Sequence, residues 1–556
     1  MSNEVDSFSH NSRFLQKLDK SKKIQIISLS VIIASALIWR LVNLPFDTPL
    51  FNDAMTYFWY AIDMSVLNKF PEGHVLTNNG WPIFISFIFK FLNSENFLDY
   101  HNIMRVFTVM ISVTTIIPIY FLCLKFMNRS FALIGVVFFA FEPRLMQNSL
   151  IGTPESMYIF LLAISFVLFL SENLKKIYLS FFIIGLLSLI RYEGLLFIIP
   201  LSVMFFVRFR GNKKKLLTFI FCFIILLSII TPVTVLRIDS MGEDGLISHI
   251  SAGPEYYKSA IDSGQSSLPQ FFEKGFTNSI KFLGWLHVPI YLIFVPVGFF
   301  LFFRKFSHKK MFIVLSLVMI LIPAFYAYSR DFSEIKYLLP LTLIFPIFAY
   351  FTIKKILNLR KNQNIIYFSI VFGIIISSLI FSSIQVTDFS HYKETYEILS
   401  DMGDREIVIN GDFGTFGGEF TLLHWIRLNN VDEFPILSKD LPDLKMKTPK
   451  QFVMMENTDN KENNDIVWFD KSNINSFEEY ITVLKKQGVT HLLLDQNNNV
   501  RLINDNLREE LRYIFHNEEE FPFLIKEYDS KEKGYKKKIK LFKINYELIN
   551  KIEIKD

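Results

Sequence analysis

The feature that most constrains this chain is a series of apolar segments, each about long enough to cross a lipid bilayer. A spanning helix needs roughly 20 apolar residues, and such segments recur from Ile24 to Ile384 between short polar hinges. We therefore expect a multi-pass α-helical membrane protein. Eleven spans are predicted: 24–44, 102–124, 130–146, 156–171, 177–190, 193–209, 216–236, 286–303, 311–328, 337–353 and 364–384.

The charge of the chain changes abruptly near residue 390. Residues 391–556 hold 24 Lys/Arg and 31 Asp/Glu, about a third of that part, whereas residues 1–390 hold 34 Lys/Arg and 22 Asp/Glu, about 14%. Soluble domains average about 25% charged residues. This contrast excludes a soluble enzyme, a disordered chain and a nucleic-acid-binding protein. It predicts a cytoplasmic tail (1–23), a membrane domain (24–390) and a soluble α/β domain (391–556).

The soluble part shows short β-branched and apolar runs alternating with helical patterns. Its Lys-rich stretch from Lys531 to Lys543 fits either a solvated hairpin face or contact with anionic head groups. The predicted strands are 407–409, 466–469, 491–494 and 539–542, and the predicted helices are 392–401, 476–487 and 503–515.

Basic residues predict how the membrane domain is oriented. Every second junction between spans is basic, and these junctions hold 22 of the 34 Lys/Arg before residue 391. Cytoplasmic loops carry such an excess of Lys and Arg. The N-terminus is therefore predicted to be cytoplasmic. The long loops 45–101 and 237–285 and the C-terminal domain are predicted to lie outside.

The first outer loop places an acidic residue beside several aromatic side chains. Asp53 is followed by Tyr57, Trp59 and Tyr60, and Trp81 lies further along the same loop. This pattern fits a carboxylate at the bilayer surface beside rings that stack on sugars. It also fits an interfacial aromatic belt with an incidental solvated Asp.

Two further outer hinges carry charges that are costly near a membrane and therefore often functional. Glu155 lies directly before the fourth predicted span. A helix N-terminus favours an acid at such a position, and this alone would explain Glu155 without any further role. Arg191 and Glu193 lie two residues apart in the third outer hinge, as a local ion pair would.

Several of the cations on the outer side, where the positive-inside rule disfavours them, lie in or next to the outer hinges: Arg191, Arg237, Arg330 and Lys336. Arg330 and Lys336 also fit a role as snorkelling anchors. Cations kept at this face suggest an anion to bind. Two acids and several cations suit transfer from a lipid phosphate, because the phosphate leaves readily once its charge is neutralised and only a base for the acceptor is then needed.

These residues resemble the GT-C superfamily of membrane glycosyltransferases, particularly the protein-mannosyltransferase (family 39) and aminoarabinose-transferase-like branch. The resemblance covers the membrane domain, about 390 residues, and the outer segment from Val483 to Asp495. Its motifs are Asp53 with its aromatics, Pro154-Glu155-Ser156, Arg191-Tyr192-Glu193-Gly194 and Lys336-Tyr337-Leu338-Leu339-Pro340.

The resemblance implies an inverting transferase whose donor is a polyprenyl- or dolichyl-phosphate sugar in the membrane lipid. The acceptor would be a protein, a lipid or a glycan. Asp53 matches the family's catalytic base, and Glu155 matches an acid that shapes the site or holds a metal. Arg330 and Lys336 match phosphate-binding positions. No cofactor follows from the sequence itself, and the resemblance leaves a divalent metal open.

The chain also departs from the family pattern. Ala54 follows Asp53 where relatives often have Glu, and Lys336 replaces an Arg, which loses bidentate phosphate binding. The outer domain has no Trp-Trp-Asp tripeptide, which argues against transfer of a whole glycan to Asn. No His pair has metal-ligand spacing.

Two other classes of protein fit parts of the pattern. A transporter or flippase for a lipid-linked saccharide would keep outward charges, but transporters tend to show internal repeats and Gly-broken spans. No repeat is found here, and the chain has only 22 Gly. A membrane scaffold with an outer interaction domain would not explain the cluster of acids and cations.

Overall fold

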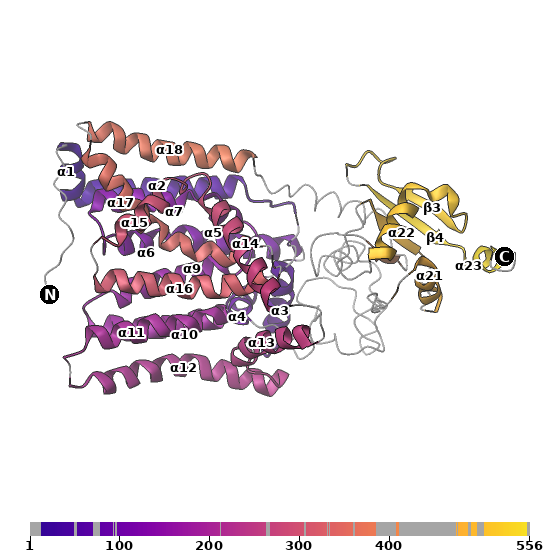
Figure 1. Ribbon diagram of the computed structural model, residues 1–556, viewed down its shortest axis with the longest axis horizontal. Coiled ribbons are helices and arrows are strands. Elements are labelled where there is room, and N and C mark those ends of the chain that lie inside the picture. Colours follow the sequence, from indigo (N-terminus) through magenta and orange to yellow (C-terminus); the bar gives the residue numbers. More distant parts are fainter. Residues whose placement is uncertain are drawn as a thin grey trace. The chain divides into compact units, whose positions relative to one another are not determined.

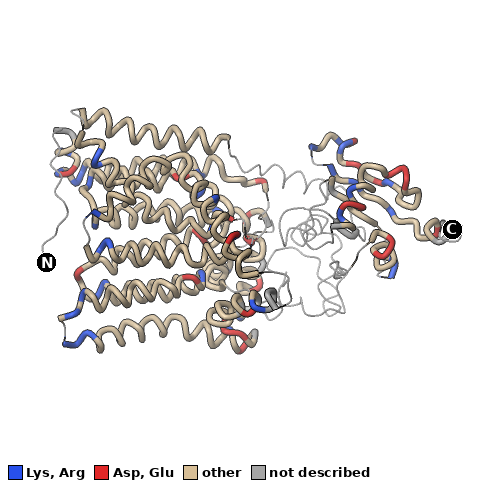
Figure 2. The backbone as a smooth tube through the Cα atoms, in the orientation of Figure 1, with Lys and Arg blue, Asp and Glu red and all other residues tan. Residues whose placement is uncertain are grey.

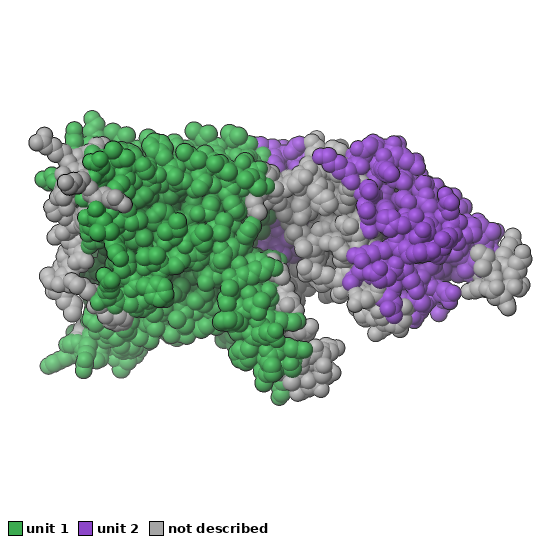
Figure 3. Space-filling view, turned by 45° about the horizontal axis from the view of Figure 1, so that its top comes forward, with its two compact units in different colours: residues 1–44, 75–87, 102–387 green, residues 45–74, 88–101, 388–556 purple. Residues whose placement is uncertain are grey.

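The computed structural model divides into two compact units, coloured separately in Figure 3. The first comprises residues 1–44, 75–87 and 102–387, and the second comprises 45–74, 88–101 and 388–556. The structure describes residues 13–48, 50, 53–70, 78–92, 94, 97–211, 213–262, 267–304, 307–330, 332, 334–359, 362–384, 407–410, 474, 476–486, 491–496, 505–536 and 538–552.

Helices dominate the chain up to residue 384, and in Figure 1 most of those in the first unit run alongside one another. Helix α10 packs against both α9 and α12, and α16 packs against α14. In chain order the helices are α1 (Arg13–Lys20), α2 (Lys22–Val42), α3 (Asp53–Leu67), α4 (Gly80–Phe89), α5 (Phe97–Thr114), α6 (Ile116–Cys123), α7 (Arg129–Ala140), α8 (Pro143–Asn148), α9 (Glu155–Phe169), α10 (Leu174–Ile190), η1 (Tyr192–Phe197), α11 (Ile198–Arg208), α12 (Lys215–Met241), α13 (Ile247–Asp262), α14 (Leu268–His287), α15 (Phe294–Phe302), α16 (His308–Ser329), η2 (Ile335–Leu343), α17 (Phe345–Asn358) and α18 (Gln363–Ile384).

The predicted multi-pass helical architecture is confirmed. Five described helical stretches are long and apolar enough to cross a membrane: 22–42, 98–123, 215–240, 308–329 and 363–384. The pair η2 and α17 makes a sixth if its 53° bend lies within one span. Shorter helices occupy the other predicted ranges, so the number of eleven spans stays a prediction.

Charged residues of the first unit are sorted along its helices. Figure 2 shows Lys and Arg mainly at the end that holds α1, and Asp and Glu mainly at the opposite end. The last turn of α1 contributes Lys17 and Lys20, and the first turn of α9 contributes Glu155. This sorting follows the predicted positive-inside pattern. The direction in which the protein crosses the membrane stays a prediction.

Both long loops that are predicted to lie outside contain helices that their mixed composition did not predict. The range 45–101 holds α3, α4 and the start of α5, and 237–285 holds the end of α12, all of α13 and most of α14. Asp244 caps α13, because its carboxylate accepts from the backbone N–H groups of Leu246, Ile247 and Ser248 at 2.6, 2.7 and 3.1 Å.

The C-terminal part contains a four-stranded sheet in the order β1-β2-β4-β3. Strand β1 pairs parallel with β2, and the other two pairs are antiparallel. The elements are β1 (Ile407–Asn410), α21 (Phe477–Lys486), β2 (His491–Asp495), α22 (Asp505–His516), η4 (Glu518–Glu520), β3 (Leu524–Asp529), β4 (Ile539–Ile544) and α23 (Tyr546–Ile552).

One apolar core joins the helices of this part to its sheet. Leu484 of α21, Leu511 of α22 and Leu492 of β2 are completely buried in it. The predicted α/β character is thereby confirmed, as are the strands near 407, 491 and 539 and the helices near 476 and 503. The predicted strand 466–469 and helix 392–401 lie outside the described residues. The described residues of the Lys-rich stretch lie between β3 and β4 and in β4 itself.

Candidate active site

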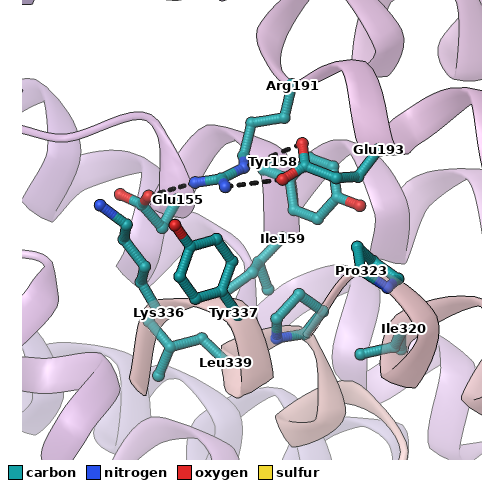
Figure 4. Close-up of a pocket in the computed structure, with 11 residues that line it drawn as sticks. Glu155, Tyr158, Ile159, Arg191, Glu193, Ile320, Pro323, Lys336, Tyr337 and Leu339 are labelled. Carbon is teal, nitrogen blue, oxygen red and sulfur yellow. Dashed lines mark hydrogen bonds and ion pairs between the residues drawn. The ribbon is translucent and has the colours of Figure 1, made fainter. Parts of the chain in front are cut away.

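A pocket in the first unit brings together charged residues from separate parts of the sequence (Figure 4). The N-terminus of α9 supplies Glu155, the break after α10 supplies Arg191 and Glu193, and η2 supplies Lys336. Tyr158 and Tyr337 add aromatic rings. The remaining lining residues are apolar: Ile159, Ile320, Pro323, Leu339 and Pro340.

Arg191 contacts two carboxylates at the centre of this group. Its Nη1 lies 2.5 Å from Oε1 of Glu155, and its Nη2 lies 2.8 Å from Oε1 of Glu193. The three residues are only 8%, 4% and 6% exposed. The ion pair that the spacing of Arg191 and Glu193 predicts is confirmed. These three charges sum to −1, and ion pairs are screened little at such depth.

The local chain path explains how Arg191 and Glu193 reach the same pocket. Helix α10 ends at Ile190, and Arg191 takes an extended conformation (φ −148°, ψ 127°) before the 3₁₀ turn η1 begins. Gly194 packs against the end of α10, where a Cβ would lie 2.8 Å from the backbone nitrogen of Ser188. A larger residue would push the turn away from α10 and Glu193 with it.

Glu155 is the first residue of α9, as expected for an acid favoured by a helix N-terminus. Glu155 also lines the pocket, so its position is not explained by the helix N-terminus alone. Its Oε1 binds Arg191, while its Oε2 is buried and has no hydrogen-bond partner among the described residues. Buried polar atoms nearly always have such partners. This oxygen is therefore available to a ligand in the pocket.

Lys336 brings a second cation to the pocket. Its Nζ lies 2.5 Å from Oε2 of Glu334, and its side chain extends in Figure 4 toward the end of the pocket that holds Glu155. The guanidinium of Arg191 lies 5.9 Å from the ring centroid of Tyr337 and 6.0 Å from that of Tyr158. Cation–π attraction at these distances helps to hold the guanidinium between the rings.

The other two predicted phosphate-binding cations do not line this pocket. Arg237 of α12 is 2% exposed, and a Cβ on Gly245 would meet its guanidinium. Arg330 follows α16, with its guanidinium 5.6 Å from the ring centroid of Tyr326. Both act on His249 of α13, whose pKa is lowered mainly by burial and further by these two positive charges, while Glu193 opposes the shift. The two cations thus share an electrostatic environment with Glu193.

The predicted base lies in the second unit. Asp53 is the first residue of α3 and is exposed. Tyr57 and Tyr60 follow on the same helix but are buried, and the side chain of Trp59 lies outside the described part. The assignment of Asp53 as base and of these rings as a stacking surface stays a prediction.

Trp81 has surroundings that its predicted role did not suggest. Its side chain is completely buried, and its indole N–H donates to the backbone carbonyl of Gly152 at 3.1 Å. The ring lies in an offset stack with Phe84, with centroids 5.8 Å apart. In this structure Trp81 therefore holds a loop in place, and stacking on a sugar stays a prediction for it.

The charged residues of the pocket are poorly arranged for a divalent metal. The carboxylates of Glu155 and Glu193 are the pocket's acids, and Arg191 lies between them. A guanidinium in that place repels a second cation, so this arrangement does not fit a metal between the two acids. Among the described residues, no three His, Cys, Asp or Glu side chains are grouped as metal ligands.

Sequence reasoning did not single out Tyr158. It lies three residues after Glu155, and residues i and i+3 of a helix share a face. Once Glu155 was placed at the start of a helix, this spacing was the signal that pointed to Tyr158. Ile320 and Pro323 of α16 gave no such signal, because apolar residues within an apolar span are not distinctive.

Part of the chain matches a known protein family. Residues 81–236 match the family described as dolichyl-phosphate-mannose-protein mannosyltransferase. This range contains Trp81, Glu155, Arg191 and Glu193, and it excludes Asp53 and Lys336. No match is found among curated proteins.

Several solved structures are similar to the chain. The apo oligosaccharyltransferase of Archaeoglobus fulgidus is 13% identical, with a TM-score of 0.48 over 86% of this chain and 70% of that one. A structure of the same enzyme with Zn and sulfate is 12% identical, with a TM-score of 0.46 over 84% and 68%. ArnT from Cupriavidus metallidurans, bound to undecaprenyl phosphate, is 11% identical, with a TM-score of 0.43 over 77% of both chains. The family match confirms, over residues 81–236, the predicted resemblance to membrane glycosyltransferases of the GT-C superfamily.

Proposed function

We propose that the chain is an inverting glycosyltransferase that moves a sugar from a polyprenyl- or dolichyl-phosphate donor to a protein, lipid or glycan acceptor at the outer membrane face. The observation that carries this proposal is the pocket. There the buried carboxylate of Glu155 lies beside Arg191, and its Oε2 has no hydrogen-bond partner among the described residues. A ligand that contacts this oxygen could also contact Lys336, which lines the same pocket. The match to a family named for dolichyl-phosphate-mannose supports the same donor class.

The proposed reaction is a single displacement at the anomeric carbon of the sugar. A carboxylate accepts the proton of the acceptor hydroxyl or amine, whose oxygen or nitrogen then bonds to that carbon. The bond between the carbon and the phosphate oxygen breaks at the same time. The electron pair leaves with the lipid phosphate, and nearby cations stabilise the added negative charge. One displacement inverts the configuration.

The contacts of the two pocket cations support one of them as the residue that stabilises the phosphate. Arg191 already contacts two carboxylates, so its positive charge is more than balanced within the triad. Lys336 is paired with Glu334, whose side chain is about half exposed and therefore better screened. We assign the first contact with the donor phosphate to Lys336. Arg330 and Arg237 are assigned supporting roles near the same face.

Two acids are assigned different roles. Asp53 is the proposed base by its match to the family, and its exposure lets it meet an acceptor from outside. Glu155 is proposed to shape the donor site, because it is buried and fixed by Arg191. No step is assigned to a metal.

The proposal is tested with purified protein and radiolabelled mannose carried on dolichyl phosphate or undecaprenyl phosphate. We expect wild type to release or transfer the sugar, and Asp53→Asn and Glu155→Gln to do so at least about 100-fold more slowly. Asp99→Asn is the matched control for Asp53, because Asp99 is also exposed in the first turn of a helix. Glu142→Gln is the control for Glu155, because Glu142 is buried but does not line the pocket.

Three outcomes would count against the proposal or its assignments. If Asp53→Asn keeps the wild-type rate, Asp53 is not the base. If neither lipid donor is consumed, a panel of other sugars on the same lipids follows, and failure of the whole panel rejects the enzyme. Movement of the lipid-linked sugar across proteoliposomes without its consumption would favour a flippase instead.

The orientation is tested separately. We expect a cysteine in place of Glu509, an exposed residue of α22, to react with an impermeant thiol reagent added outside whole cells. The two native cysteines, Cys123 and Cys222, are buried and provide the unreactive background. Protection of the introduced cysteine would place the C-terminal domain in the cytoplasm and reject the outer location of the site.

A further inference from the structure

We infer that residues 78–81, within the first outer loop, are positioning residues that hold together the two hinges of the active site. The inference rests on the proposed function and adds a role for residues that do not line the pocket. One hinge is the segment before α9, which carries Glu155. The other is the segment after α10, which carries Arg191 and Glu193.

The first contact ties this segment to the hinge of Glu155. The indole N–H of Trp81 donates to the carbonyl of Gly152, three residues before Glu155, at 3.1 Å. Gly152 has φ +94°, a conformation that glycine adopts without strain, so the chain turns sharply there. The Trp81 side chain is completely buried. A donor fixed in this way sets the position of the turn from which α9 starts.

The second contact ties the same segment to the hinge of Arg191. The backbone N–H of Tyr192 donates to Oδ1 of Asn78 at 3.3 Å. Tyr192 lies directly between Arg191 and Glu193, the two residues whose ion pair faces the pocket. Asn78 is 8% exposed, so water competes little for this hydrogen bond.

Close backbone packing makes the third contact. A Cβ on Gly80 would lie 2.7 Å from the carbonyl carbon of Leu189 and 2.8 Å from the backbone nitrogen of Ile190. The end of α10 therefore rests directly on the start of α4. Because backbone atoms cannot rotate away as a side chain can, even a methyl group here must separate the two segments.

Together the three contacts place both hinges on one four-residue support. Glu155 and Arg191 lie 36 positions apart in the sequence, yet their side chains are 2.5 Å apart. Catalytic geometry of this kind is sensitive, since a shift of about 1 Å can lower a rate about 100-fold. The support explains how the side chains of Glu155 and Arg191 stay so close, although the segments that carry them do not belong to one helix.

The structural part of the inference is tested by hydrogen exchange of the full chain in detergent. We expect Gly80→Ala and Trp81→Phe to increase exchange in peptides covering both 150–158 and 188–195. Gly373→Ala is the matched glycine control, because nothing lies within 4 Å of its added Cβ. Trp39→Phe is the matched tryptophan control on a partly exposed position of α2. Unchanged exchange in either hinge would overturn the inference, whether or not the protein turns over a donor.

The catalytic part is tested by a double-mutant cycle with the radiolabelled mannosyl lipids. We expect Gly80→Ala to slow sugar release on the order of 100-fold and Trp81→Phe about 2- to 10-fold. In a Glu155→Gln background, both changes should have a smaller effect, because part of each effect depends on the placement of Glu155 against Arg191. Full additivity would show that they only destabilise the fold, and it would reject the positioning role. If wild type is inert, the proposed function fails, and the exchange result alone decides the inference.

Discussion

Replacing Arg191 with Met should destabilise the protein more than any loss of a surface charge. The change keeps much of the apolar side chain but removes the cation that contacts Glu155 and Glu193, both nearly buried. Breaking a buried ion pair by removing one partner costs about 3–5 kcal/mol. Here the two carboxylates would also repel each other without the guanidinium between them. We therefore expect a loss of about 3–5 kcal/mol in the free energy of unfolding.

The assay is unfolding by sodium dodecyl sulfate in mixed micelles, followed by circular dichroism. Lys175→Met is the control, because Lys175 is exposed and should change the free energy of unfolding by no more than about 0.5 kcal/mol. The double variant Arg191→Met/Glu193→Gln should recover part of the loss, since it removes one of the two stranded charges. The reasoning is refuted if the single variant loses less than about 1 kcal/mol, or if the double variant is less stable than the single one.

Three further predictions concern the pocket and the outer loops. Lys336→Met should raise KM for the lipid donor about tenfold or more, and Lys336→Arg should largely preserve it, as initial rates against donor concentration will show. Glu155→Gln should lower kcat while leaving the affinity for undecaprenyl phosphate nearly unchanged, measured as the thermal shift on adding that lipid. Partial burial acts to raise the pKa of Asp244, but hydrogen bonds from three backbone amides outweigh burial and lower this pKa. The depressed pKa means that this cap stabilises α13 at neutral pH and is lost as the pH falls below about 4, so hydrogen exchange in α13 should rise there in wild type but not in Asp244→Asn.

Much of the fold could be predicted from patterns within short segments of the sequence. Apolar length predicted the helices that are long and apolar enough to cross a membrane, and alternation of basic junctions predicted the sorting of charge seen in the first unit. Strand β3 (Leu524–Asp529) was missed. Among the described strands it pairs only with β4. It exposes Ile525, Lys526 and Glu527, so its sequence has neither the alternation of a half-buried strand nor a continuous apolar run.

The charged residues of the site could be predicted from the sequence, but the contacts between them could not. Glu155, Arg191 and Lys336 were named because ionisable residues at a membrane face are costly. Their meeting in one pocket depends on how separate helices pack, which no local pattern encodes. Trp81 shows the limit most clearly: its ring favoured a stacking role, but its burial and its bond to Gly152 come from a contact 71 positions along the chain.

The two 3₁₀ segments that border the pocket have a consequence for its dimensions. A 3₁₀ helix rises about 2.0 Å per residue and an α-helix about 1.5 Å. Rewinding the nine residues of η2 as α-helix would therefore shorten that segment by about 4.5 Å and rotate Lys336 about the helix axis. The six residues of η1 would shorten by about 3 Å. The width of the pocket therefore depends on whether η1 and η2 are wound as 3₁₀ or as α-helix. A change in this winding alters the width of the pocket without moving a whole helix through the bilayer.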